Sequence, residues 1–341
     1  MQKDNIQALG KLIATPKNVL VIGHKNPDGD AIGSCMGWAL FLRSLGHQVE
    51  VIMPNDYPDF LTWVPAQEEI VLFSENPDSV QKSVSDSDLI FTLDFNHFSR
   101  LGEDFARVLK SSDSTFVMID HHEQPDDYAE VCISHPEYGS TAELVFECIF
   151  HLDMLDKINK EVASCLYLGI MTDTGSFKFP STTARTHEIA SVLITKGAKS
   201  SEIQQKTFDS SSYHRLKLLG QAMQNLKYLP EYSTAYIHLS QDEMDKNNFQ
   251  KGDTEGFVNY GLSIKGVVLA AIFKEDKNQN IIKISFRSKG NFDVNKLART
   301  HFHGGGHINA AGGRSDLSLK ETMEKFVHLL DAYKTELNAA L

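Results

Sequence analysis

The chain has 341 residues, of which 41% are hydrophobic and 23% charged, and 45 acidic against 33 basic residues give a formal net charge of −12. This length predicts two domains, and the acidic balance argues against long duplex nucleic acid as a partner, since such binding needs a broad basic surface. No run approaches 18 apolar residues, no signal peptide is evident and no CxxC pair occurs, so we expect a reduced, cytoplasmic protein without a membrane span.

The first part of the chain alternates between short apolar runs and segments with helical spacing. The apolar runs predict strands at residues 18–23, 48–53, 88–94, 114–120 and 130–134. The intervening periodicity predicts helices at residues 31–46, 141–152 and 161–173. Strands separated by helices indicate βαβ units, a parallel sheet and ligands at the carboxyl ends of the strands.

After Gly197 the pattern changes. Residues 199–229 look helical throughout and suit a connector, and apolar strands follow at 234–240, 266–276 and 280–290, the last two joined by a hairpin turn. SQDE at 240–243 and SLKE at 318–321 fit helix capping boxes. We therefore predict an α/β protein with an N-terminal parallel-sheet domain (1–198), a helical linker (199–227) and a smaller α+β C-terminal domain (228–341).

Four stretches of the N-terminal part place acids or histidines at the ends of predicted elements. They are HKNPDGD (His24, Asp28, Asp30), LIFTLD (Asp94), FVMIDHH (Asp120, His121, His122) and LGIMTDTGSF (Asp173). Neighbouring parallel strands end on one edge of a sheet, so these side chains can converge there. Clustered buried carboxylates repel one another unless cations compensate them. A ligand set of imidazoles and carboxylates without thiolates favours Mn²⁺ or a similar ion, and a pair of such ions can activate water for phosphoryl chemistry.

Two of these stretches also have an ordinary structural interpretation. HKNPDGD alone can be a strand-to-helix turn, and Asp94 alone can be a helix N-cap. The tandem histidines have no obvious packing advantage at the end of a buried strand, and the four stretches together favour a site. His97, three residues past Asp94, is a further candidate for that site. The remaining histidines outside residues 301–307 are interpreted as surface or core residues: His47, His135, His151, His187, His214, His238 and His328.

The C-terminal part contains one segment suited to phosphate, HFHGGGHINAAGGR at 301–314. Three consecutive glycines favour a loop whose backbone N–H groups can wrap an anion. Residues 281–314 hold one acidic residue and six basic ones: Lys283, Arg287, Lys289, Lys296, Arg299 and Arg314. Arg287 lies in an alternating strand and could bind phosphate through two hydrogen bonds. The structural alternative is a glycine-rich hairpin with a solvated basic face.

The four acidic stretches resemble the successive motifs of the DHH phosphoesterase superfamily, and GGGHINAAGG resembles the signature of the DHH-associated C-terminal domain. The resemblance covers nearly the whole chain and is strongest to the bacterial nanoRNase/pAp phosphatase (bifunctional oligoribonuclease) group. It implies a hydrolase with two Mn²⁺ ions, for which Mg²⁺ or Co²⁺ could substitute. The implied substrates are short single-stranded oligoribonucleotides, cleaved as an exonuclease, and 3′-phosphoadenosine 5′-phosphate (pAp). No membrane partner is implied, and a homodimer is compatible.

The resemblance also implies roles for particular residues. His24, Asp28 and Asp94 would hold one ion, and Asp30, Asp94, His121 and Asp173 would hold the second, with Asp94 bridging. His122 would face the scissile phosphate, and Asp120 would orient a histidine. The implied substrate-binding residues are Arg287, His303, Gly304, Gly305, Gly306, His307 and Arg100.

Several functions compete with this interpretation. Hydrolysis of cyclic di-AMP or its linear product pApA uses the same kind of metal site, so the motifs do not separate it from the leading hypothesis. A family II pyrophosphatase would carry an SRKKQ-like element in place of GGGH, and the larger exonucleases of the superfamily carry additional domains. A catalytically silent nucleotide- or RNA-binding module would be expected to have lost part of the ligand set, which is complete in this sequence.

Overall fold

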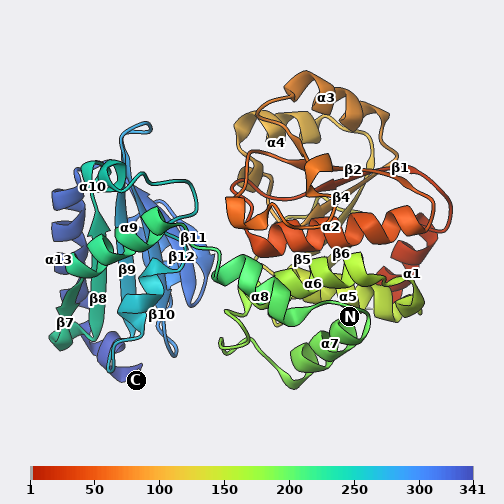
Figure 1. Cartoon of the computed structure of the whole chain (residues 1–341). Coiled ribbons are helices and arrows are strands. Elements are labelled where there is room, and N and C mark those ends of the chain that lie inside the picture. The colour runs from red at the N-terminus through yellow and green to blue at the C-terminus, as the bar shows by residue number, and fades with distance from the viewer. Residues whose placement is uncertain (1–2, 341) are drawn as a thin grey trace. The chain divides into compact units, whose positions relative to one another are not determined.

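The chain forms two compact units in the computed structural model, which describes residues 3–340, and the division falls between Ser210 and Ser211 (Figure 1). Each unit contains one six-stranded sheet. Within residues 3–340, every helix is too short or too polar to cross a bilayer.

The sheet of the first unit is entirely parallel, as predicted. Its strands follow the order β3-β2-β1-β4-β5-β6. The order reverses between β1 and β4, and in open α/β sheets ligands bind at the carboxyl ends of strands beside such a reversal. The two-residue strand β3 escaped prediction because it is too short to show a period. The strands are β1 (Asn18–Ile22), β2 (Gln48–Met53), β3 (Val71–Leu72), β4 (Leu89–Leu93), β5 (Thr115–Asp120) and β6 (Val131–Ser134).

Helices cover both faces of this sheet, which explains why its strands are apolar on both sides (Figure 1). Val19 and Val21 point toward the larger core, formed with α1 (Lys3–Leu12), α2 (Gly29–Ser44), α5 (Thr141–His151) and α6 (Lys160–Asp173). Leu20 and Ile22 point the other way, toward α3 (Pro77–Asp86) and α4 (Glu103–Lys110). The unit ends with α7 (Ala184–Thr195) and α8 (Ser200–Phe208).

Glycines bring α2 and α6 unusually close together. A Cβ atom on Gly33 of α2 would lie 2.5 Å from the carbonyl oxygen of Cys165, and one on Gly169 of α6 would lie 2.6 Å from the Asp30 carboxylate. Real Cβ atoms do not approach neighbours this closely. The small residues therefore set the distance between the start of α2, which carries Asp30, and the last turn of α6, which carries Asp173.

The second unit holds a mixed sheet with the order β11-β12-β10-β9-β8-β7, in which β8 and β9 are parallel and the other pairs antiparallel. One face packs on α9 (Tyr213–Gln224), α10 (Gln241–Lys246) and α11 (Phe257–Leu262). The other face packs on α12 (Val294–His301) and α13 (Leu319–Ala339). The strands are β7 (Lys227–Leu229), β8 (Thr234–Leu239), β9 (Leu269–Asp276), β10 (Ile281–Ser288), β11 (Gly305–His307) and β12 (Ala310–Ser315).

Of the features predicted after residue 198, the two capping boxes are confirmed and the helical connector is only partly helical. Both capping boxes are present, at Ser240 with Glu243 and at Ser318 with Glu321. Residues 199–229, expected to be helical throughout, instead form α8, a break at 209–212, α9 and the strand β7. The polar composition of this stretch hid both the break and the short strand.

Candidate metal centre

The turn after β1 places three predicted residues at the reversal of strand order. Asp28 is the N-cap of α2, and its Oδ1 accepts hydrogen bonds from the backbone N–H groups of Asp30 (3.0 Å) and Ala31 (3.1 Å). The same Oδ1 lies 4.0 Å from His24 Nε2. HKNPDGD is therefore both the strand-to-helix turn and part of a side-chain cluster, so the two interpretations of this stretch do not exclude each other.

Asp94 occupies the middle of the cluster. Its carboxylate is buried; Oδ2 lies 3.3 Å from His24 Nε2, and Oδ1 lies 3.5 Å from His121 Nε2 and 3.8 Å from His122 Nδ1. The backbone of Asp94 is left-handed, with φ of 64°, and such strain is often found at functional sites. Asp94 contacts three histidines from two sequence motifs.

The N-cap interpretation of Asp94 is wrong, because the short helix η3 (Phe98–Leu101) that follows is capped by His97. The His97 side chain accepts a hydrogen bond from the N–H of Ser99 (3.0 Å), and its Nε2 lies 3.2 Å from Asp126. His97 is thus engaged in a local cap and in a surface contact with Asp126.

The first turn of α5 holds Asp30. Its Oδ2 accepts the N–H of Thr141 (2.6 Å) and its Oδ1 accepts the N–H of Ala142 (2.9 Å). Unpaired N–H groups and the helix dipole make this end of a helix favourable for a carboxylate. On the other side, His121 Nε2 lies 3.9 Å from Asp30 Oδ2 and 3.4 Å from Asp173 Oδ2. His121 therefore joins Asp30, Asp94 and Asp173.

Thr141 is a residue that the sequence argument missed. Besides its N–H bond to Asp30, its hydroxyl donates to Asp94 Oδ1 at 2.9 Å. One residue thus contacts the carboxylates of two different motifs. The signal was present as Ser140-Thr141 at the start of a predicted helix, but only the fold reveals that this helix end points at Asp30 and Asp94.

The electrostatics of the cluster favour a cation. Burial raises the pKa of Asp30 well above its ordinary value, and the charge of Asp94 adds to this effect. Burial likewise raises the pKa of Asp173 to about 6. Burial also acts to raise the pKa of Asp94, but contact with His24 and the charges of the other histidines outweigh it and lower that pKa. These carboxylates repel one another, and a bound cation would remove that cost.

The buried Nε2 atom of His24 points the same way. Among the described residues it makes no hydrogen bond of good geometry, and its nearest polar neighbour is Asp94 Oδ2 at 3.3 Å. A buried polar atom in this position is costly unless a further group satisfies it. Around Asp94, three groups of side chains could hold a metal ion, each with ligand atoms within 4.8 Å of one another, and Asp94 belongs to all three: His24-Asp28-Asp94, Asp30-Asp94-His121 and Asp94-Asp120-His122. The donor chemistry therefore fits divalent ions.

Two histidines are oriented by groups behind them. The fully buried Asp120 accepts the backbone N–H of His122 at 2.8 Å, and its Oδ1 lies 2.8 Å from His122 Nδ1. His121 Nδ1 lies 3.2 Å from the carbonyl oxygen of Tyr138. A carboxylate or carbonyl on Nδ1 fixes the tautomer and leaves Nε2 available to a metal or substrate.

Arg100 lies near the first of these metal groups. Its carbonyl oxygen accepts the N–H of Lys25 at 2.7 Å, which ties η3 to the HKNPDGD turn. Burial lowers the pKa of His24, contact with Asp94 raises it and the charge of Arg100 opposes that rise; the balance is a raised pKa. Arg100 thus supplies positive charge beside the acidic cluster.

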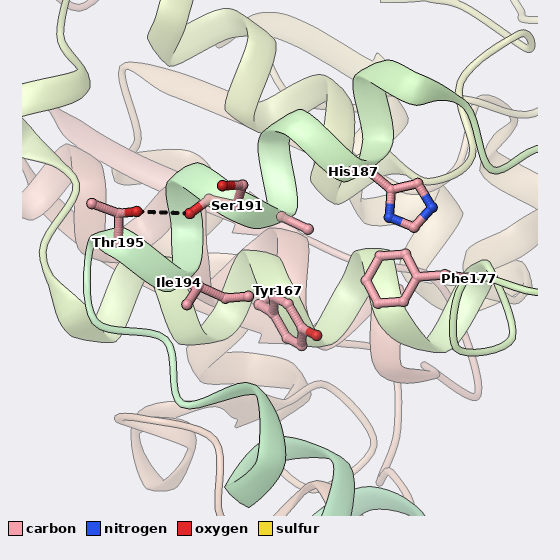
Figure 2. Close-up of a pocket in the computed structure, with 7 residues that line it drawn as sticks. Tyr167, Phe177, His187, Ser191, Ile194 and Thr195 are labelled. Carbon is pink, nitrogen blue, oxygen red and sulfur yellow. Dashed lines mark hydrogen bonds between the residues drawn. The ribbon is translucent and has the colours of Figure 1, made fainter.

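The chain after Asp173 is strained and anchored by aromatic stacking. Gly175, Ser176 and Phe177 are all left-handed, with φ of 57°, 59° and 63°. The Phe177 ring stacks on His187 with centroids 5.4 Å apart, and Tyr167 lies beside it (Figure 2). These rings line a pocket of about 310 Å³ along α7 that contains no acidic residue. His187 is thus a packing residue away from the acidic cluster, in agreement with its structural interpretation.

The glycine run of the second unit is a hairpin strand. β11 pairs with β12, the N–H of Gly304 donates to Ala298 (3.2 Å) and the N–H of Gly306 donates to Asn295 Oδ1 (3.0 Å). A Cβ atom on Gly304 would lie 1.9 Å from the Gly312 carbonyl oxygen. Close backbone approach explains these glycines, which form a hairpin; their part in substrate binding stays a prediction.

Arg287 and His307 nevertheless share one face of this sheet. Arg287 of β10 is opposite Ala310 of β12, and Ala310 is opposite His307 of β11. Residues directly opposite each other point to the same side, so only the small Ala310 stands between the two side chains. His303, just before the hairpin, is exposed and left-handed, with φ of 46°.

Comparisons with known proteins agree with this architecture. The sequence profile of the DHH family, N-terminal domain, matches residues 18–170, and that of the DHHA1 domain matches residues 231–336. The crystal structure of an exopolyphosphatase-related protein from Bacteroides fragilis is 39% identical, with a TM-score of 0.94 over 98% of both chains. The chain belongs to the DHH family. This membership makes the DHH protein a phosphoesterase hydrolase.

Relatives of this DHH protein include two kinds of named enzyme. The bifunctional oligoribonuclease and PAP phosphatase NrnA of Thermus thermophilus is 29% identical over 94% of this chain and 91% of its own length. The cyclic-di-AMP phosphodiesterase GdpP of Bacillus subtilis is 27% identical over 96% of this chain. This chain spans 49% of that second relative, so the likeness to GdpP concerns about half of it.

Proposed function

We propose that this DHH protein is a Mn²⁺-dependent phosphohydrolase that degrades short oligoribonucleotides from one end and dephosphorylates pAp. The observation that carries the proposal is Asp94, a buried carboxylate in contact with three histidines at the reversal of strand order. The likeness to NrnA over nearly the full length of both chains supports this choice of substrate class.

The proposed ligands form two groups that share Asp94. His24, Asp28 and Asp94 would hold one ion, and Asp30, Asp94, His121 and Asp173 the other; two histidines in an otherwise carboxylate set favour Mn²⁺ over Mg²⁺. When bound, a pair of divalent ions would lower the pKa of a water molecule and polarise the phosphoryl group. The side chains contribute geometry: α5 holds Asp30, and Thr141 holds Asp94 relative to it.

His122 is the proposed catalytic residue outside the ligand groups. Asp120 holds its Nδ1 and its backbone N–H, so the ring cannot turn freely. Its Nε2 would stabilise charge on the phosphoryl oxygens or donate a proton to the leaving oxygen. The buried Asp120 carboxylate would stabilise the protonated ring during that transfer.

Substrate binding is assigned to basic and small residues. Arg287 and His307 share a sheet face with only Ala310 between them, an arrangement suited to a terminal phosphate. His303 and the close-packed Gly304, Gly305 and Gly306 would shape the same region, and Arg100 would add a contact beside the ligand groups. The net charge of −12 supports a substrate of a few nucleotides, since binding along a long polymer would need more basic surface.

Two other functions use the same residues. A cyclic di-AMP or pApA phosphodiesterase is supported by the likeness to GdpP over 96% of this chain. A silent nucleotide-binding module is opposed by the complete ligand groups and by the orientation of His122, neither of which binding alone requires.

A substrate panel tests the proposal. Purified protein with Mn²⁺ would be assayed side by side on pAp, oligoribonucleotides of two to five residues, pApA, cyclic di-AMP and pyrophosphate. We expect the highest kcat/KM on the short oligoribonucleotides or pAp. A preference for cyclic di-AMP or pApA would replace the proposed substrate, and hydrolysis of none of them would contradict the proposed function.

A further inference from the structure

Three basic residues lie side by side across the second sheet. Lys274 of β9 is directly opposite Lys283 of β10, and Lys283 is directly opposite Arg314 of β12. Directly opposite residues point to the same face, with Cβ atoms roughly 5 Å apart. We call Lys274, Lys283 and Arg314 the basic row. The proposed substrate contacts include none of these three residues.

The basic row shares its sheet face with Arg287. Lys283 and Arg287 are four residues apart on β10, so they point to the same side, with Ser285 between them. The strand rise puts the row ~13 Å from Arg287. The positions in between are small on the β12 side, where Gly312 is opposite Ser285 and Ala310 is opposite Arg287. A flat strip of sheet therefore connects Arg287 to the row.

This strip is open on one side only. On β9, Ala270 and Ile272 point to the same face, and there α9, α10 and α11 cover them. On β10 and β12, Lys283, Gly312 and Arg314 are exposed. Lys296 and Arg299 do not contribute to this strip, because they lie on α12, which packs on the opposite face.

The basic row is costly for the fold. Like charges directly opposite each other on adjacent strands are destabilising. Lys283 is compensated by Asp276, with Nζ 2.7 Å from Oδ2. Lys274 donates to the Thr254 hydroxyl at 2.7 Å, and burial together with the charge of Lys283 lowers its pKa to about 8. The Arg314 side chain has no ion-pair partner within residues 3–340. Uncompensated positive charge in a chain of net −12 suits an anionic ligand.

We propose, resting on the proposed function, that the basic row binds a second phosphate of the oligoribonucleotide and so sets the preferred substrate length. The ~13 Å from Arg287 to the row is several times the ~3.4 Å rise per nucleotide of a stacked strand. A phosphate bound at Arg287 and one bound at the row therefore belong to different nucleotides. At that rise ~13 Å is about four steps, so pAp, dinucleotides and trinucleotides are too short to reach both, whereas an oligoribonucleotide of about five residues can.

The experiment measures kcat/KM as a function of length in Arg314→Gln and Lys283→Gln, using pAp and oligoribonucleotides of two to five residues. We expect pAp, the dinucleotide and the trinucleotide to be hydrolysed within about twofold of wild type, and the pentanucleotide to lose about tenfold, the effect of one charge-assisted contact. The dependence of log kcat/KM on log salt for the longest substrate should become shallower by ~0.7 per lost contact. Lys296→Gln, an exposed basic residue on the opposite face, is the matched control and should match wild type at every length.

The outcomes separate this inference from the proposed function. Suppose that wild type hydrolyses the substrates and that Arg314→Gln lowers kcat/KM equally at every length or at none. That result overturns the role of the basic row and leaves the proposed function standing. If wild type hydrolyses no oligonucleotide, the function fails. Fluorescence anisotropy with labelled oligonucleotides of the same lengths then tests whether the basic row binds phosphate. An affinity that grows with length in wild type but not in Arg314→Gln supports binding by the row, and equal affinities of the two proteins overturn it. Because Arg314 is exposed, the Arg314→Gln protein should unfold at a thermal midpoint no lower than that of wild type.

Discussion

Two hydrogen bonds from His122, one from its N–H and one through Nδ1, end on the carboxylate of Asp120. Asp120 is fully buried and lies at the end of β5, so it has no freedom to follow the ring if the ring moves. It acts on the reaction only through His122 and is a positioning residue. This arrangement separates two tasks that the tandem histidines perform: His121 faces the carboxylates, and His122 is held for the substrate.

Asp120→Asn should lower kcat by about 10- to 100-fold, the usual effect of removing a carboxylate behind a catalytic or ligating histidine. Mn²⁺ binding should change far less, because Asp120 is not among the proposed ligands. Steady-state kinetics and Mn²⁺ titration measure the two effects separately, and the pH profile of kcat should shift because the His122 ring loses its anionic partner. Glu137→Gln, which removes the charge of a surface carboxylate 3.0 Å from His135 Nδ1, is the control. If Asp120→Asn lowered Mn²⁺ affinity as much as kcat, Asp120 would not be a positioning residue for His122.

Individual residues were predictable where their position in the sequence coincides with the end of a strand. His24, Asp94 and His121 could be grouped from the sequence alone because parallel strands end on one edge. Thr141 could not, since its contacts depend on a helix end meeting residues 47 and 111 positions away. The hairpin at 304–306 could not be distinguished from an open loop in the sequence, because conformational freedom and close backbone approach call for the same residue type.

Among elements, the contact of α2 with α6 determines the geometry of the acidic cluster. Asp28 is the N-cap of α2, Asp30 lies in its first turn, and α6 ends at Asp173. Gly169 lets the two helices approach so closely that a Cβ atom there would meet Ala142 Cβ at 2.5 Å and the Asp30 carboxylate at 2.6 Å. Any added methyl group must therefore displace Asp30 or the start of α5.

Gly169→Ala should destabilise the protein by about 1–3 kcal/mol through overpacking. It should also weaken Mn²⁺ binding, because Asp30 is pushed from its position. Gly220→Ala in α9 is a matched control: a Cβ atom there meets nothing within 4 Å, so helix propensity alone should stabilise that variant by up to ~1 kcal/mol. Denaturant unfolding and Mn²⁺ titration provide the test. A Gly169→Ala protein with wild-type stability and wild-type Mn²⁺ affinity would show that the helices can separate without consequence.

The β9 strand carries a pH-dependent cost at Lys274. Its pKa is lowered from 10.5 to about 8 by burial and then by Lys283, so the unfolded chain binds this proton more tightly than the folded one. Stability should therefore rise as pH increases from about 8 to 10.5. Lys274→Met should remove that rise, and its stability relative to wild type should be greater at pH 7 than at pH 10. Urea unfolding at both pH values measures this, with Lys296→Met as the exposed control. If the difference in unfolding free energy between Lys274→Met and wild type were the same at pH 7 and pH 10, the lowered pKa of Lys274 would be contradicted.

Elements were predictable in proportion to their length and periodicity. The five main strands of the first sheet were found because each is a continuous apolar run, as strands covered on both faces are. The parallel pairing of β8 with β9 was not foreseen, because 29 residues without a clear period separate them. β11 was missed because a strand made of glycine and histidine has no strand propensity.

For the whole molecule, the acidic net charge and the two local positive regions favour the same kind of substrate. The net charge of −12 opposes long polyanions, while Arg100 in the first unit and the Arg287 face in the second offer positive charge at defined places. A chain built this way is expected to bind substrates with few phosphates. Its central requirement is the shared ligand Asp94, on which both proposed metal groups depend.

The most direct test is Asp94→Asn, studied by Mn²⁺ titration and by hydrolysis of pAp and a trinucleotide. Asparagine keeps the volume of the side chain and tolerates the left-handed backbone of residue 94, so the circular dichroism spectrum should match that of wild type. We predict two bound Mn²⁺ per wild-type chain, at most one in the variant, and turnover lowered by at least about 10³-fold. An Asp94→Asn protein that keeps two ions and near-normal turnover would contradict the two-metal mechanism.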